Sequence, residues 1–342
     1  MNTAAGPVFL LSGFLGSGKT TLLNAVLRAP AFARTAVIVN EFGEIGLDHL
    51  LVARGNDNVV LLEAGCLCCT IADSLHETLA DLNFRRVRGE IPAFERVIVE
   101  TTGLADPAPI LNTLLGHRLV TDHYRLESVV VTVDAQHAQA GLDAHPEVAK
   151  QVAVADRLVL TKGDLVAPSD ALRARLDALN PDAARFDTRD PGAALAAFAP
   201  GDRHRLPQRF VAVGHRTAAR HVHRHDPRIR ADCFVLPRPP SWAGVAAWWR
   251  LASASFGDRL LRCKGLLEIA DDGAIVFVQG VQRVFHAPER LSHWPDGDHR
   301  CRLVCITRDV DADALRRTLV AFDVAPGTPP DLSPTELHFA RT

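Results

Sequence analysis

Three cysteines lie within four residues in the segment EAGCLCCTIADSL (63–75), at Cys66, Cys68 and Cys69. Thiolates are preferred ligands of Zn²⁺, Cu(I) and other soft or borderline ions. In an extended segment the Cys66 and Cys68 side chains point to one face, whereas Cys69 points elsewhere unless the chain turns. A tetrahedral zinc site needs four ligands, and this segment supplies at most three. The spacing predicts an incomplete soft-metal site, and the alternative is a buried loop of small residues.

A second pattern, GFLGSGKTT (13–21), has the spacing of a phosphate-binding loop, G-x-x-x-x-G-K-T. It follows an apolar run and opens a helical pattern, so we prefer a phosphate site to a glycine turn without a ligand. Glycines let backbone N–H groups curl around phosphate oxygens. Lys19 would reach the β- and γ-phosphates, and the Thr20 hydroxyl would ligate Mg²⁺. The predicted nucleotide contacts here are Gly13, Gly16, Ser17, Gly18, Lys19, Thr20 and Thr21.

The segment RVIVETTGLADP (96–107) supplies a second phosphate-side motif. Glu100 ends an apolar run, and its carboxylate could hold Mg²⁺ together with Thr20. The Gly103 N–H could meet the γ-phosphate. Because phosphoryl transfer depends mainly on positioning and charge neutralisation, a dedicated base can be absent. The catalytic residue stays unassigned, and the candidates are Glu100, Glu41 and Glu44.

The segment LVLTKGDL (158–165) predicts the base specificity. The Asp164 carboxylate can accept two hydrogen bonds from guanine N1–H and N2–H₂, a donor pair that adenine lacks. The Lys162 stem can lie across the base. Thr161 stands where the usual pattern has asparagine, and a hydroxyl makes fewer hydrogen bonds than an amide. We therefore expect GTP to be preferred to ATP, with a guanine affinity that Thr161 reduces.

Carboxylates that could complete the metal site lie in NEFGEIGLD (40–48), where Glu41 is the predicted further ligand and Glu44 the other candidate. This segment follows the second strand-like run, and the cysteines follow the third. In a parallel sheet both loops emerge at the edge where phosphates bind. The hypothesis is that γ-phosphate contacts move this loop and couple hydrolysis to metal delivery.

The elements that must position these residues alternate between short apolar runs and helical patterns. Continuous apolar strands separated by helices predict a parallel sheet with helices on both faces, the α/β class of P-loop NTPases. The strand-like runs are residues 8–11, 36–40, 58–63, 96–100, 128–134 and 157–161.

The pattern changes near residue 200, where Arg and His become frequent and periodicity weakens. A DDG turn between apolar runs then predicts a hairpin in a smaller α+β domain. The expected organisation is a nucleotide-binding domain at 1–200, a His/Arg-rich linker at 201–230, a C-terminal domain at 231–326 and a tail at 327–342.

Composition limits the partners and the compartment. Lys and Arg number 38 against 40 for Asp and Glu, which gives a net charge of −2, so we expect neither nucleic acid nor a membrane as a partner. Neither a signal pattern nor an apolar run of about 18 residues is present, which predicts a cytoplasmic protein with reduced thiols.

Taken in order, GFLGSGKTTLL, VNEFGEIGLD, EAGCLCCT, VETTGLADP and TKGD resemble the motifs of CobW-like GTPases. RCKGLLEI and VQGVQRVFH are similar to the C-terminal domain of that family, so the resemblance runs from about 8 to 322. It implies a P-loop GTPase that chaperones a transition metal, usually zinc or cobalt. Two features depart from the family: Thr161, and a short HVHRH segment where members often carry a longer histidine-rich stretch.

The predicted function is a GTP-binding and GTP-hydrolysing metallochaperone that delivers a metal, with zinc favoured, to a client protein under nucleotide control. It implies Mg²⁺ and Zn²⁺ or Co²⁺, with GTP or GDP and a client metalloprotein as partners; an oligomer is possible. The alternatives are a metal store or sensor whose turnover is unimportant, and an ATP-dependent cofactor-insertion factor.

Other groups favour structural roles. His221, His223 and His225 alternate and could collect metal, or they could belong to a solvated linker. The spacing of Cys263, Cys301 and Cys305 suits no standard metal motif and predicts core positions. Packing is also the expected role of Trp242, Trp248 and Trp249.

Overall fold

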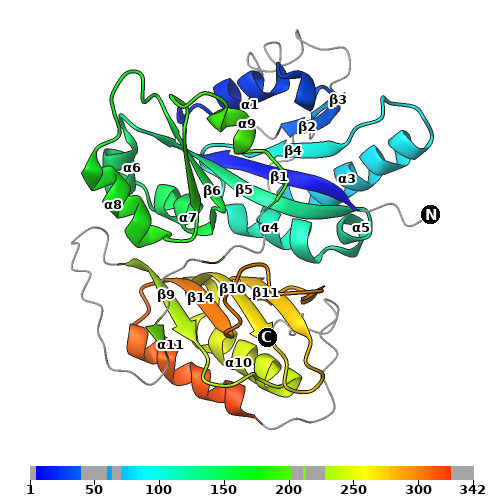
Figure 1. The fold of residues 1–342 in the computed structure, drawn as a ribbon. Coiled ribbons are helices and arrows are strands. Elements are labelled where there is room, and N and C mark those ends of the chain that lie inside the picture. The colour runs from blue at the N-terminus through cyan, green and yellow to red at the C-terminus, as the bar shows by residue number, and fades with distance from the viewer. Residues whose placement is uncertain are drawn as a thin grey trace. The chain divides into compact units, whose positions relative to one another are not determined.

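The computed structural model describes residues 5–39, 60–63, 71–201, 206, 211–212 and 228–324. It divides into two compact units (Figure 1): Met1–Ala174 with Ala183–Arg203, and Arg175–Asp182 with His204–Thr342. Several predicted residues lie outside the described ranges, namely Cys66, Cys68, Cys69, Glu41, Glu44, His221, His223 and His225.

The first unit is built on a seven-stranded parallel sheet in the order β3-β2-β4-β1-β5-β6-β7. The predicted parallel sheet is confirmed, and β7 is a strand that the apolar runs did not indicate. The strands are β1 Gly6–Gly13, β2 Thr35–Val39, β3 Val60–Glu63, β4 Arg96–Glu100, β5 Tyr124–Asp134, β6 Arg157–Thr161 and β7 Ala184–Asp187.

Helices cover both faces of this sheet, with α1 and α9 on one face and α3, α4, α5 and α7 on the other (Figure 1). The helices are α1 Lys19–Leu27, η1 Pro30–Phe32, α3 Ile71–Val87, α4 Pro107–Gly116, α5 Arg118–Thr121, α6 Ala138–Ala144, α7 Pro146–Val154, α8 Asp170–Leu179 and α9 Ala193–Ala196. This two-sided cover explains why the central strand β1 is apolar from Val8 to Leu11, all of which are buried.

The core beneath α1 and α9 fixes the strand that carries the phosphate loop. Phe9 and Leu11 of β1 are buried with Leu23 and Val26 of α1. The Phe9 ring packs against Phe198 at a centroid distance of 5.7 Å. Burying side chains of this size stabilises the fold by about 1.5–3 kcal/mol each, so the loop between β1 and α1 starts and ends on rigid elements.

The second unit contains a sheet in the order β12-β11-β10-β14-β9-β8, and β13 pairs with β11. Its neighbouring strands are antiparallel except for β8 and β9. Its elements are β8 Val211–Ala212, β9 Ile229–Val235, α10 Trp242–Phe256, η2 Gly257–Arg259, β10 Leu260–Glu268, β11 Ile275–Val281, β12 Val284–Phe285, β13 Glu289–Leu291, β14 Arg302–Arg308, α11 Ala312–Thr318 and η3 Leu319–Asp323.

The predicted DDG hairpin is confirmed between β10 and β11. Gly273 has φ +66°, a left-handed conformation that glycine adopts without steric cost. The Ile269 N–H donates to the Ala274 carbonyl at 2.9 Å and closes the turn. The α+β character expected of this part of the chain follows from this sheet and its helices.

The core assignments of the C-terminal cysteines and tryptophans are confirmed. Cys263 and Cys305 face each other on β10 and β14, and both are fully buried, as Cys301 nearly is. Burial raises the pKa of the Cys301 and Cys305 thiols, so both stay protonated. The buried tryptophans lie on α10, where Trp248 stacks on Phe322 at 4.9 Å.

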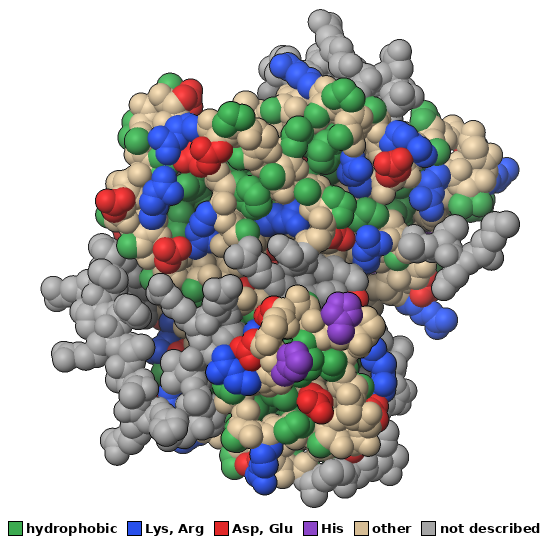
Figure 2. Space-filling view, viewed as in Figure 1, with side chains coloured by type: hydrophobic (Ala, Val, Ile, Leu, Met, Phe, Trp, Pro, Cys, Tyr) green, Lys and Arg blue, Asp and Glu red, His purple; other side chains and the backbone are tan. Residues whose placement is uncertain are grey.

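Two further observations concern the surface. No helix among the described residues is long and apolar enough to cross a membrane. On the face shown in Figure 2, Lys and Arg side chains of the first unit are interspersed with Asp and Glu.

Candidate functional site

The phosphate loop between β1 and α1 takes a shape that requires its glycines. Gly13 has φ +141°, and a Cβ there would lie 2.1 Å from Thr132 Oγ1. Gly18 has φ +89° at the start of α1. The Ser17 N–H donates to the Phe14 carbonyl at 3.1 Å, and its hydroxyl lies 2.7 Å from Thr132 Oγ1. These bonds curl the loop back on itself and fix its backbone.

The Lys19 ammonium and the N-terminus of α1 both lie at this loop. Lys19 Nζ donates to the carbonyl oxygens of Gly13 at 2.9 Å and Phe14 at 3.2 Å, which holds the ammonium against the loop. The first turn of α1 contains no acidic residue, and no side chain caps its N-terminus. The backbone N–H groups and partial charge of this helix end therefore favour an anion.

The two predicted Mg²⁺ ligands meet across the sheet. The Thr20 hydroxyl donates to Glu100 Oε1 at 3.0 Å, although the residues are 80 positions apart in the chain. Glu100 ends β4, beside Leu11 of β1, and it is 5% exposed. A hydroxyl and a carboxylate oxygen are donors that Mg²⁺ prefers, so the residues present fit this ion.

The segment after β4 lies directly against the phosphate loop. A Cβ on Gly103 would lie 2.6 Å from the Leu15 backbone nitrogen. The Gln151 amide, on α7 and 1% exposed, donates to the carbonyls of Gly103 at 3.1 Å and Ala105 at 3.2 Å. Gln151 thus holds the predicted γ-phosphate segment in place.

Hydroxyl groups at the strand ends form a buried layer beneath the phosphate loop. Thr101 Oγ1 donates to Ser12 Oγ at 3.0 Å, and Thr132 joins this layer through its contact with Ser17. Ser12, Thr132 and Gln151 were not among the site residues predicted from the sequence. The available signal was weak: a hydroxyl residue near the end of β1, β4 and β5, and one amide within the apolar pattern of α7.

Thr161 faces the phosphate loop. Its hydroxyl donates to the Ser17 carbonyl at 2.7 Å, and the side chain is 6% exposed. The hydroxyl therefore connects the loop after β6 to the loop after β1. This contact of Thr161 was not predicted from the sequence. The reduced guanine affinity expected of Thr161 in place of asparagine stays a prediction.

Lys162 and Asp134 form the next pair along this edge. Lys162 has φ +57°, and its Nζ lies 2.7 Å from Asp134 Oδ2. His137 Nδ1 lies 3.0 Å from the same oxygen. Burial alone would raise the pKa of Asp134, but the hydrogen bonds from Lys162, His137 and the Gln136 amide outweigh burial and hold it below its ordinary value.

Asp164 is exposed, and the backbone beside it packs on an arginine that the sequence analysis missed. A Cβ on Gly163 would lie 3.0 Å from Cδ and Nε of Arg189. Arg189 donates through Nε and Nη2 to Asp187 at 3.0 and 2.7 Å. Those hydrogen bonds are the main cause that lowers the pKa of Asp187 and raises that of Arg189. Arg189 was missed because it follows β7, which lacks an apolar run.

The strands that precede the predicted metal loops end in one row. Glu100 pairs with Val39, the last residue of β2, and Val39 pairs with Glu63, the last residue of β3. Neighbouring strands lie about 4.8 Å apart, so the two loops leave the sheet within about 10 Å of the Glu100 backbone. Among the described residues, no group of three or more His, Cys, Asp or Glu side chains is arranged to hold a metal.

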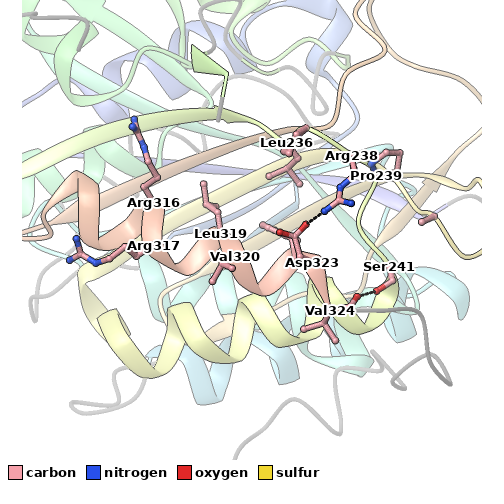
Figure 3. Close-up of a pocket in the computed structure, with 13 residues that line it drawn as sticks. Leu236, Arg238, Pro239, Ser241, Arg316, Arg317, Leu319, Val320, Asp323 and Val324 are labelled. Carbon is pink, nitrogen blue, oxygen red and sulfur yellow. Dashed lines mark hydrogen bonds and ion pairs between the residues drawn. The ribbon is translucent and has the colours of Figure 1, made fainter. Parts of the chain in front are cut away.

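A separate cavity of about 750 Å³ lies in the second unit between α11, η3 and the segment after β9 (Figure 3). Arg238 pairs with Asp323 at 2.9 Å, and the Ser241 hydroxyl donates to the Val324 carbonyl at 2.8 Å. None of the predicted site residues lines this cavity.

Comparison with known proteins finds family models and relatives that match both parts of the chain. The family model "CobW/HypB/UreG, nucleotide-binding domain" matches residues 7–187, and "Cobalamin synthesis protein cobW C-terminal domain" matches 229–322. The chain is 33% identical over 280 residues to the zinc chaperone YjiA of Escherichia coli, covering 82% of this chain and 87% of YjiA. It is 28% identical to the zinc chaperone CobW of Sinorhizobium sp, covering 92% and 96%.

Among solved structures, the Zn(II)-bound YjiA GTPase from E. coli superposes with a TM-score of 0.70 at 26% identity, covering 94% of this chain and 99% of that one. The two family models match this chain in the order nucleotide-binding domain, then C-terminal domain. The chain belongs to the CobW/HypB/UreG family of P-loop proteins, which includes GTPases and zinc chaperones.

Proposed function

We propose that this protein is a GTP-hydrolysing metallochaperone that binds Zn²⁺ at the Cys66, Cys68 and Cys69 loop and delivers it to a client protein. The observation that carries the proposal is the hydrogen-bonded Thr20–Glu100 pair at the start of the strand-end row from which both predicted metal loops leave. In this proposal the nucleotide's metal ion would bind beside the predicted position of the cargo metal.

The phosphate half of the nucleotide site would use the curled loop and two charged side chains. Backbone N–H groups of the loop would bind phosphate oxygens, and Lys19 would leave its carbonyl partners to contact the β- and γ-phosphates. Thr20 and Glu100 would hold Mg²⁺, which neutralises developing charge on the phosphates. The Gly103 N–H would contact the γ-phosphate, because Gln151 holds that segment against the loop.

The base half would use two side chains of opposite charge. Asp164 would accept the N1–H and N2–H₂ hydrogen bonds of guanine. Arg189 lies beside Gly163 and pairs with Asp187 through Nε and Nη2. Its Nη1 could then donate to guanine O6, where adenine carries an amino group instead. Both contacts favour GTP over ATP.

The metal half would couple to the γ-phosphate through the loop after β2. Glu41 lies two residues beyond the end of β2, and Cys66 lies three beyond the end of β3. A carboxylate that moves when γ-phosphate is lost would complete or open the thiolate site. Zinc is the proposed cargo because relatives are named zinc chaperones and thiolates favour this ion. The proposed domain limits remain 1–200, 201–230 and 231–326, with a tail at 327–342.

Metal analysis of the purified protein with GTP, GDP or no nucleotide tests the proposal. We expect one zinc per chain whose affinity changes with the nucleotide, and loss of that zinc in Cys66→Ala/Cys68→Ala. Unchanged zinc stoichiometry and affinity in this variant would remove the proposed site.

Two further measurements separate the alternatives. Tighter binding of ATP than of GTP would replace this proposal with an ATP-dependent insertion factor. Hydrolysis that does not respond to zinc would favour a store or sensor. The variants Asp164→Ala and Arg189→Ala test base selection directly, because each should lower the preference for GTP over ATP.

A further inference from the structure

One helix, α7, contacts both of the segments that are predicted to bind phosphate. At its N-terminus the His145 ring stacks on the ring of Phe14 in the phosphate loop, with ring centroids 4.6 Å apart. In its second turn, Lys150 and Gln151 contact the segment between β4 and α4. A single helix therefore joins two segments that lie far apart in the chain.

The Gln151 amide supports the backbone of the segment between β4 and α4. The carbonyls of Gly103 and Ala105 lie in an irregular stretch, outside any helix or strand, and Gln151 Nε2 donates to them at 3.1 and 3.2 Å. The Gln151 side chain is only 1% exposed, among valines and alanines of the same helix. An apolar side chain would fill this space equally well, so the two hydrogen bonds explain why an amide is buried here.

The Lys150–Asp106 ion pair holds the far end of the same segment. Lys150 Nζ lies 2.9 Å from Asp106 Oδ2, and the side chains are 23% and 35% exposed. Asp106 also caps α4, because its Oδ1 accepts from the Ala108 N–H at 3.0 Å. One carboxylate thus connects α7 to the N-terminus of α4. Gly103 lies between this connection and the end of β4.

The contact at the other end of α7 supports the phosphate loop itself. The Phe14 carbonyl accepts from the Ser17 N–H at 3.1 Å, the Ser17 hydroxyl at 2.7 Å and Lys19 Nζ at 3.2 Å. His145 packs on the ring of the residue that makes these three bonds. The phosphate loop would contact a diphosphate and a triphosphate alike, whereas the Gly103 N–H would contact only a γ-phosphate.

We propose that Lys150 and Gln151 are positioning residues for the γ-phosphate, and that they set the preference of the site for a nucleoside triphosphate over the diphosphate. They hold the Gly103 N–H against the phosphate loop, and a misplaced N–H loses a contact that only the triphosphate makes. This inference rests on the proposed function for one assignment, the contact of Gly103 with the γ-phosphate. It depends neither on the base, nor on zinc, nor on the client protein.

The test compares the affinities of the full chain for a GTP analogue that resists hydrolysis and for GDP. Gln151→Met keeps the volume of the side chain and removes its donor. We expect it to lower the affinity for the GTP analogue about tenfold and to leave that for GDP within about twofold. Lys150→Met should act in the same direction by about threefold, because its ion pair is partly exposed.

Two variants on the same helix are the controls. Glu147→Gln changes a partly exposed residue of the first turn and should leave both affinities unchanged. His145→Ala removes the contact with Phe14 and should lower both affinities by the same factor, since it acts through the phosphate loop.

A double-mutant cycle tests the ion pair. Asp106→Asn keeps a residue that caps a helix well and removes the charge that faces Lys150. Asp106→Asn and Lys150→Met should each weaken binding of the GTP analogue by the same factor, and the double variant should be no weaker than either. Losses that add in the double variant would contradict the role given to this pair.

Hydrogen exchange in the nucleotide-free protein gives a second readout. Backbone amides of residues 103–106 should exchange faster in Gln151→Met than in the parent, and at the parent's rate in Glu147→Gln. An unchanged ratio of GTP-analogue to GDP affinity in Gln151→Met, or unchanged exchange, would overturn the inference. If the guanine or zinc assignment fails in its own test, the same ratio is measured with an ATP analogue and ADP, so the two failures are distinguishable.

Discussion

The two halves of the candidate nucleotide site are built differently. In the phosphate half, Lys19 lies against loop carbonyls, and Glu100, which accepts from the partly exposed Thr20, is buried. In the base half, Asp164 is exposed and Arg189 is held by an ion pair near the surface. Phosphate groups are common to all nucleotides, so a single rigid cradle serves every one of them. Base selection depends on a few exposed charges, which single substitutions can change without disturbing the cradle.

The largest effect is expected from a substitution that crowds the backbone of the phosphate half. Gly103→Ala would place a Cβ 2.6 Å from the Leu15 nitrogen, so the phosphate loop must shift. Overpacking of this kind costs about 1–3 kcal/mol, and we expect GTP and GDP affinities to fall up to about 100-fold by calorimetry. The control is Gly141→Ala, whose nearest neighbour is a methyl group at 3.6 Å. GTP and GDP affinities of Gly103→Ala within a factor of three of the parent protein would show that nucleotide binding does not require Gly103 to lie so close to Leu15.

The next substitution removes a charge from the same half and keeps the shape of the side chain. Glu100→Gln can still accept the Thr20 hydrogen bond, but a neutral amide is a poor Mg²⁺ ligand. We expect the Mg²⁺ concentration for half-maximal GTP hydrolysis to rise about 10- to 100-fold. Nucleotide binding without Mg²⁺ should change little. The surface variant Glu95→Gln is the control, and an unaltered Mg²⁺ dependence of Glu100→Gln would argue against the assigned role.

In the base half, two variants should separate the contacts to the two sides of guanine. ITP keeps O6 and N1–H but lacks the 2-amino group, so Asp164→Ala should lose more affinity for GTP than for ITP. Arg189→Ala should weaken both by the same factor, because O6 is present in both. Each loss is expected to be about tenfold for Asp164 and smaller for Arg189. Arg118→Ala, a highly exposed arginine, is the control. Equal loss of GTP and ITP in Asp164→Ala would contradict the assignment.

The sequence predicted the phosphate half better than the base half, for a physical reason. Phosphate binding needs glycines, a lysine and a hydroxyl at fixed local spacing, so Gly13 to Thr20 could be found by pattern. Arg189 follows a strand of four residues without an apolar run, and β7 is recognisable from its pairing with β6. Gln151 belongs to the site through a contact across 48 positions of the chain. Such contacts depend on tertiary packing, which local periodicity does not record.

A smaller effect concerns how charge holds the base half together. The pKa of Asp134 lies below its ordinary 3.8, so the folded chain binds this proton less readily than the unfolded chain. Its contribution to stability is complete above the ordinary pKa and is lost as the pH falls through the lowered one. Asp134→Asn should therefore destabilise the fold by about 1.5 kcal/mol at pH 7, and the difference from the parent should shrink towards pH 3.

Urea unfolding at pH 7 and pH 3 measures this difference. Asp122→Asn removes an exposed carboxylate and should change stability by less than about 0.5 kcal/mol. A difference between Asp134→Asn and the parent that is the same at both pH values would mean that the carboxylate's charge contributes nothing.

The smallest expected effect tests whether the two halves are independent. Thr161 connects them, because its hydroxyl donates to the Ser17 carbonyl at 2.7 Å while Lys162 and Asp164 follow it in the chain. Thr161→Val keeps the shape and removes this bond, which is worth about 1 kcal/mol. If the hydroxyl acts through the phosphate loop, affinities for GTP, GDP and ATP should all fall about fivefold. If it acts on the base, only the guanine nucleotides should lose affinity, and Thr161→Asn should then raise their preference over ATP. A uniform loss would make Thr161 part of the phosphate half, although it lies within the motif that selects the base.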